Sequence, residues 1–68
     1  MRDWVKVTEV NSVFTAQNII AFLADNEIEA SEIDKTDSSY AGAFGKVEIY
    51  CHKENAVAAL HLIEKNNF

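Results

Sequence analysis

Hydrophobic and polar residues alternate along two segments of the chain, with the two-residue period of a half-buried β-strand. We predict a first strand over Trp4–Val10 and a third strand over residues 46–52. One side of these strands is apolar and is expected to face the core: Val5, Val7, Val47, Ile49 and Cys51. The opposite side is polar and aromatic: Trp4, Lys6, Thr8, Lys46, Glu48, Tyr50 and His52.

The spacing of apolar residues lengthens to that of a helix in two other segments. Asn11 and Ser12 are good N-cap residues, so a first helix is predicted over Val13–Asp25. It should end near Asn26, which tolerates the left-handed backbone found at helix ends. A second helix is predicted over residues 54–66. The two apolar stripes are Val13, Ala16, Ile19, Ile20 and Leu23, and then Ala56, Ala59, Leu60 and Ile63.

The region between the first helix and the third strand divides into a strand and a loop. Residues 28–35 are predicted to form the second strand, with a bulge or an early bend because their apolar positions break strict alternation. Those positions are Ile28, Ala30 and Ile33. Residues 36–45 hold both glycines of the chain among Asp, Ser and Thr residues. This composition favours turns, so the segment is predicted to be the one long loop.

The predicted order of elements is strand, helix, strand, strand, helix. A right-handed first crossover lets the third strand lie between the first two, antiparallel to both. We therefore predict one α+β domain over residues 1–68, a two-layer ferredoxin-like plait (βαββα). Its three-stranded antiparallel sheet has the order 1-3-2, both helices cover one face, and the usual last strand is missing. The predicted core is Val5, Val7, Ala16, Ile19, Ile20, Leu23, Ile28, Ile33, Val47, Ile49, Cys51, Ala56, Leu60 and Ile63.

Several segments together resemble a known family, and the resemblance covers nearly the whole chain. They are Trp4-Val5-Lys6-Val7, Asn11-Ser12, Ile28-Glu29-Ala30, Asp37-Ser38-Ser39-Tyr40 and Gly45-Lys46-Val47-Glu48-Ile49-Tyr50. The sequence is similar to a small bacterial domain of unknown function described as a prokaryotic signal-transducing protein. The resemblance implies a ferredoxin-like fold, akin to the nitrogen-regulatory signalling proteins, and a role in regulation or binding. The family commonly has a glycine just before the second strand, where this chain has Glu27.

Composition narrows the classes of function. Six basic against eleven acidic residues give a formal net charge of −5, which repels polyanions, so neither nucleic acid nor a membrane surface is an expected partner. No apolar run reaches the ~20 residues that span a bilayer. A single cysteine and two histidines are too few for a zinc site and fit a reducing compartment. We expect a cytoplasmic protein without metal or cofactor, and no enzyme, because no acid and base are paired.

The outward side of the predicted sheet is the first candidate site. Leaving Trp4 and Tyr50 uncovered would expose two rings that each remove about 150–250 Å² from water when buried. We therefore expect a homo-oligomer, with a dimer first, joined through this face or through the exposed edge of the first strand. The alternative is that the Lys6 and Lys46 side chains and the long loop cover the rings within one chain. The candidate interface residues are Trp4, Lys6, Thr8, Phe14, Glu48 and Tyr50, of which Phe14 forms a separate, second candidate.

The long loop is the second candidate site. Its acceptors and hydroxyls could hold a small polar ligand, which would make the chain a ligand sensor. The residues concerned are Asp37, Ser38, Ser39, Tyr40 and Lys46. A self-capped turn is the favoured alternative, because no helix start follows to complete a phosphate cradle. Cys51 is interpreted as a small core residue, and His52 and His61 as solvated surface.

Overall fold

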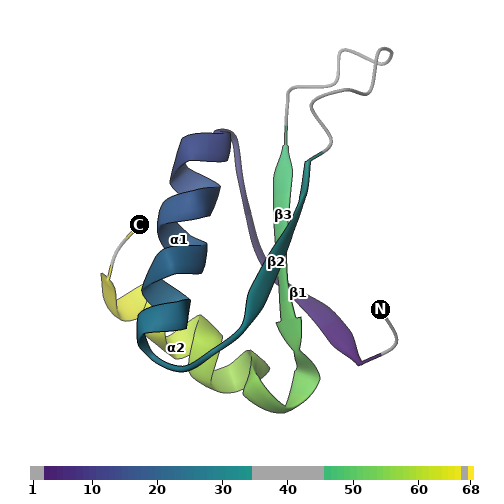
Figure 1. Cartoon of the computed structure of the whole chain (residues 1–68), viewed down its shortest axis with the longest axis vertical. Helices are drawn as coiled ribbons and strands as arrows, with labels where there is room; N and C mark the ends of the chain where they lie inside the picture. Colours follow the sequence, from purple (N-terminus) through teal and green to yellow (C-terminus); the bar gives the residue numbers. More distant parts are fainter. Residues whose placement is uncertain (1–2, 35–45, 67) are drawn as a thin grey trace.

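The described chain follows the predicted order of strands and helices (Figure 1). The computed structural model describes residues 3–34, 46–66 and 68. Its elements are β1 (Trp4–Val10), α1 (Val13–Asp25), β2 (Ala30–Asp34), β3 (Val47–His52), a 3₁₀ turn η1 (Lys53–Asn55) and α2 (Ala56–Asn66). The predicted bounds of the first strand and the first helix are confirmed.

The sheet has the order β1-β3-β2, with β3 antiparallel to both neighbours. The two outer strands therefore run parallel to each other, which the connection through α1 allows. Figure 1 shows α1 and α2 on the same side of the sheet. The α+β class, the strand order and the two helices are as predicted. One face of the sheet thus carries the core, and no described element covers the other.

The core lies between β3 and the two helices. The strand alternates strictly, and its inward side chains Val47, Ile49 and Cys51 are fully buried. From α1, Ile19 and Leu23 fill the facing layer; each buried aliphatic side chain of this size contributes about 1.5–3 kcal/mol. The complete set of buried residues is Val7, Ala16, Ile19, Leu23, Ile28, Val47, Ile49, Cys51 and Ala59.

A β-bulge interrupts β1 instead of β2. Lys6 lies opposite Tyr50, but Thr8 lies opposite Ile49, so β1 has one extra residue at Val7. Of the two alternatives predicted for the second strand, a bulge or an early bend, the bulge is wrong over Ala30–Asp34, where β2 pairs with β3 in unbroken register. The extra residue shifts the phase of β1, which takes Thr8 out of the predicted outward row. Its place on that side is taken by Glu9, opposite Glu48.

Capping fixes both ends of α1. The Ser12 hydroxyl accepts a hydrogen bond from the Thr15 N–H at 3.3 Å, as its N-cap role predicts. At the other end, the Glu27 N–H donates to the Ala24 carbonyl and the Ile28 N–H to the Leu23 carbonyl, both at 2.9 Å. This pair of bonds is the Schellman motif.

The left-handed residue of this motif is Glu27, with φ of 66°. Asn26 has φ of −104°, so the prediction that Asn26 would take this geometry is wrong by one residue. The Asn26 side chain instead donates from Nδ2 to the Phe22 carbonyl at 2.9 Å. The helix end therefore places a non-glycine residue in the left-handed position.

The second strand is shorter than predicted. It begins at Ala30, because Ile28 belongs to the helix cap and is buried there. Ile33 lies opposite Glu48, which is on the outward phase of β3. The prediction that Ile33 belongs to the core is therefore wrong. The predicted end of this strand at residue 35 and the predicted loop 36–45 lie outside the described residues.

The second helix is rotated about its own axis relative to the prediction, so that a different side faces the core. A 3₁₀ turn replaces its expected first residues, and α2 begins at Ala56. Its buried stripe is centred on Ala59, which leaves Leu60 48% exposed. Leu62 is instead partly buried against the core. The assignment of Leu60 to the core is thus corrected, and Leu62 takes its place.

Candidate interaction surface on the open face and edge of the sheet

The side of the sheet that faces away from the helices carries most of the residues of the predicted interface. We define the open face by the side chains that share the outward phase of the register: Trp4, Lys6, Glu9, Ser31, Ile33, Glu48, Tyr50 and His52. The structure brings Trp4, Lys6, Glu48 and Tyr50 together on it, as predicted. Thr8 is displaced by the bulge, and Glu9 joins the surface.

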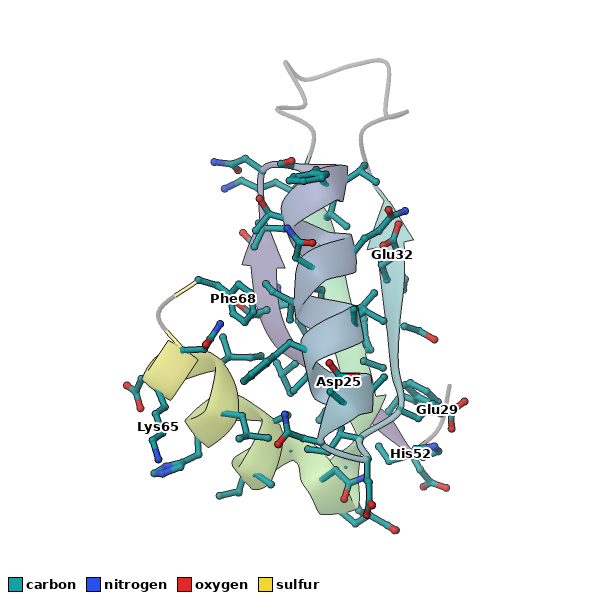
Figure 2. The ribbon with its side chains drawn as sticks, turned by 60° about the vertical axis from the view of Figure 1, so that its left-hand side comes forward. Asp25, Glu29, Glu32, His52, Lys65 and Phe68 are labelled. Carbon is teal, nitrogen blue, oxygen red and sulfur yellow. The ribbon has the colours of Figure 1, made fainter. Side chains whose placement is uncertain are left out.

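An aromatic pair forms one end of the open face. The rings of Trp4 and His52 have centroids 4.2 Å apart and are tilted by 42°. The His52 Nε2 lies 3.5 Å from Glu29 Oε1, and Figure 2 shows these two side chains beside each other at the end of the sheet. Trp4 is partly buried within the chain. A partly covered indole at the margin of a sheet is a common anchor in protein interfaces.

Charged side chains form the centre of the open face. The Lys6 ammonium lies 3.1 Å from Glu9 Oε1 and 3.6 Å from Glu48 Oε2. Lys46 reaches Glu9 Oε2 at 3.6 Å. Two cations and two anions therefore alternate across the surface. We call these four residues, Lys6, Glu9, Lys46 and Glu48, the charge network.

Hydrogen bonds shift the pKa values of groups in and beside the charge network. The hydrogen bond and charge of Glu9 raise the pKa of Lys6, and the same bond lowers the pKa of Glu9. The Tyr50 hydroxyl donates to Glu48 Oε1 at 2.9 Å. This bond, together with desolvation, raises the pKa of Tyr50. The Glu48 side chain is only 13% exposed, and the Tyr50 hydroxyl and the Lys6 ammonium both contact its carboxyl group.

The outer edge of β1 is the second part of the surface. Among the described strands, β1 pairs only with β3. The Lys53 N–H donates to the Asp3 carbonyl at 2.7 Å. Asp3 and Lys53 are therefore a hydrogen-bonded pair at the end of the ladder between β1 and β3. Because backbone groups alternate along a strand, those of Asp3 and Val5 face β3 and those of Trp4 and Lys6 face away from it. The N-terminal half of β1 therefore presents donors and acceptors to an additional strand.

The helical side of the molecule carries separate apolar features. Phe14, the second predicted interface candidate, lies in the first turn of α1 and is 75% exposed. It is on the far side of the sheet from Trp4, so the two candidates do not form one surface. Phe68 packs edge-on against Phe22 with ring centroids 5.3 Å apart and lies beside α1 (Figure 2). Next to this contact is an open pocket of ≈ 360 Å³, lined by Phe22, Leu62, Lys65 and Asn66.

Other predicted site residues differ in how far the structure describes them. Asp37, Ser38, Ser39 and Tyr40 of the predicted ligand loop lie outside the described residues. Lys46 is described and belongs to the charge network. The Cys51 thiol is buried, and burial raises its pKa, which agrees with its interpretation as a core residue. In residues 3–34, 46–66 and 68, His, Cys, Asp and Glu form no group of three placed to hold a metal ion.

The sequence signals that were missed concern Glu9 and the edge geometry. Glu9 lies on the apolar phase of a regular strand, so only the bulge could place it beside Lys6.

None of the helices in the described part of the chain is long and apolar enough to cross a membrane.

The chain was compared with protein-family models, with curated proteins and with solved structures, and none of the three comparisons gave a match.

Proposed function

We propose that this chain is a non-enzymatic interaction module that associates with a second copy of itself through the open face and the β1 edge. In this proposal the fold is a ferredoxin-like plait without its last strand. A complete plait has a further strand after α2 that pairs with β1. The observation that carries the proposal is the outer edge of the N-terminal half of β1, which pairs with no described strand other than β3 and has the partly buried indole of Trp4 beside it.

The size of the chain supports association. A domain of 68 residues that relies on one small core gains only about 3–5 kcal/mol from it. Binding to a second folded copy stabilises such a domain further, because the partner binds the native state and not the unfolded chain. A regulatory role in the cytoplasm, as in bacterial signalling, is the part of the proposal that the family resemblance supports.

Replacing Trp4 and Tyr50 together by Ser tests the proposal. We expect the double variant to have a smaller mass by light scattering than the wild-type chain, because Trp4 lies at the β1 edge and Tyr50 bonds to Glu48 of the charge network on the open face. Phe14→Ser is the matched control, since it removes an exposed ring from the helical side and should leave the mass unchanged. Circular dichroism checks that each variant is folded. A double variant with the mass of the wild type would contradict the proposal.

A small-ligand sensor that uses residues 36–45 is the alternative proposal. Its support is the hydroxyl and carboxylate composition of that segment and the position of Lys46 where the segment meets β3. Thermal-shift measurements against nucleotides and metabolites separate the two proposals, because a true ligand raises the melting temperature with its concentration. The absence of any shift across a broad library would count against the sensor.

A further inference from the structure

We propose that two copies pair antiparallel through residues 4–6 of β1, about a two-fold axis at Val5, to form one continuous six-stranded sheet. This inference rests on the proposed self-association and specifies which contact produces it. In this register Trp4 lies opposite the partner's Lys6, and Lys6 lies opposite the partner's Trp4. The partner is a second copy of this chain.

The backbone of β1 fits this arrangement. Trp4 and Lys6 both direct their N–H and C=O groups away from β3, as the bond from Lys53 to Asp3 requires. Pairing Trp4 with the partner's Lys6 lets each residue exchange two hydrogen bonds, so the symmetric ladder contains four. Val5 lies between them and faces the partner's Val5 in a non-hydrogen-bonded pair, where side chains approach most closely.

Charge favours this register over the two registers whose axis lies one residue away, at Lys6 or at Trp4. Moving the axis to Lys6 would place Lys6 opposite the partner's Lys6, and like charges directly opposite one another destabilise a strand pair. Moving it to Trp4 would place the two indoles opposite each other and take Lys6 past the described end of the partner strand, so neither Lys6 would gain a cation–π contact. The axis at Val5 instead places each Lys6 ammonium beside the indole of the partner's Trp4, a favourable cation–π pair.

The bulge limits the ladder to the N-terminal half of β1. The extra residue at Val7 disrupts regular pairing beyond Lys6, and bulges and lysines are known to restrict pairing at sheet edges. In Figure 1 the N-terminal half of β1 extends away from α1. The contact is therefore short and specific.

The charge network favours edge pairing over stacking of two open faces. Stacking would remove Lys6, Glu9, Lys46 and Glu48 from water, and desolvation of ion pairs commonly costs more than their attraction returns. Edge pairing leaves Glu9 and Lys46 in solvent, where their side chains are 38% and 48% exposed. Lys6, whose ammonium lies beside Glu9 and Glu48 within the chain, is the one residue of the charge network that also borders the partner's indole.

A cross-linking experiment tests the register. The variant Val5→Cys must also carry Cys51→Ala, because Val5 lies opposite Cys51 within the chain and the two thiols would pair. Under mild oxidation we expect this variant to form a disulfide-linked dimer at least tenfold faster than Thr8→Cys with Cys51→Ala. Thr8 lies beyond the bulge, so its matched variant should not bring two thiols together.

A backbone variant provides a second readout that leaves every side chain in place. The full chain is short enough for chemical synthesis, and an N-methyl group on Lys6 removes an edge donor that β3 does not use. We expect the dimer dissociation constant measured by sedimentation to rise about tenfold or more, because two symmetric hydrogen bonds are lost. Circular dichroism should be unchanged.

The outcomes separate this inference from the proposed function. A wild-type chain that stays monomeric at all concentrations overturns both. A wild-type dimer that resists N-methylation and shows no preference for the Val5 cross-link overturns the edge register, while association through the open face survives. Rapid cross-linking at Val5 together with weakening by N-methyl-Lys6 supports the register.

Discussion

Replacing Glu27 by Gly tests the helix end that orients α1 against the sheet. Glu27 has φ of 66°, where an L-residue loses about 1–2 kcal/mol through contact of its Cβ with the backbone. Glycine avoids this cost, but it has more freedom in the unfolded chain, which subtracts about 0.4–1 kcal/mol. The expected net effect is a gain of roughly 0.5–1 kcal/mol in the free energy of unfolding, or about 2–8 °C in melting temperature.

Two control variants isolate the backbone contribution. Glu27→Ala removes the carboxylate, which lies unfavourably near the helix C-terminus, but retains the Cβ and hence the strain. Ala24→Gly introduces a glycine at an exposed position inside α1 and should cost about 1 kcal/mol. Urea unfolding with a shared slope gives all three values on one scale.

Comparing the stabilities of the glycine and alanine variants at position 27 separates the effect of the backbone from that of the carboxylate. If Glu27→Gly is no more stable than Glu27→Ala, the positive φ carries no cost and the Schellman interpretation is wrong. If both gain equally over the wild type, the charge near the helix end is the cause. A gain confined to glycine would confirm the backbone argument.

Three further predictions concern the core and the open face. Leu62→Ala should cost about 2 kcal/mol in urea unfolding and Leu60→Ala less than about 0.5 kcal/mol, because only Leu62 packs against the core; equal costs would contradict the placement of α2. Alkaline absorbance titration of the Glu48→Gln variant should show a lower pKa for Tyr50 than in the wild type, since the hydrogen bond from Tyr50 to Glu48 raises it. The hydrogen bond from Tyr50 contributes its full stability below the ordinary tyrosine pKa of 10.0, and this stability is lost as pH rises through the raised pKa of Tyr50 in the folded chain. An identical Tyr50 titration in the wild type and in Glu48→Gln would refute the coupling. The buried Cys51 thiol, whose pKa is raised by burial, should react with a disulfide reagent far more slowly in the native chain than in urea, and equal rates would show that the site is open.

The regular elements could be predicted because their patterns are local. The alternation along residues 47–52 and the stripe of α1 each report which side of an element is buried, and the N-cap at Ser12 marks where the helix begins. The strand order followed from the sequence of elements and the preference for right-handed crossovers. These features need no knowledge of distant residues.

The features that were missed depend on tertiary contacts. No glycine or other local signal marks the bulge at Val7; the register with β3 produces it. The rotation of α2 depends on the close approach of the small residue Ala59 to the core, which leaves Leu60 outside. Glu27 takes left-handed geometry because the cap bonds and the burial of Ile28 outweigh its steric cost.

The bulge also determines which mode of association costs less free energy. Without it, Thr8 would face outward and Glu9 inward, and the charge network would keep two lysines but only one glutamate, Glu48. With it, Glu9 completes a network in which each cation has an anion within 3.6 Å. Salt screens exposed pairs of this kind, with a Debye length of about 8 Å at physiological ionic strength. Contact between two open faces should therefore respond strongly to salt, whereas backbone pairing along residues 4–6 should respond little.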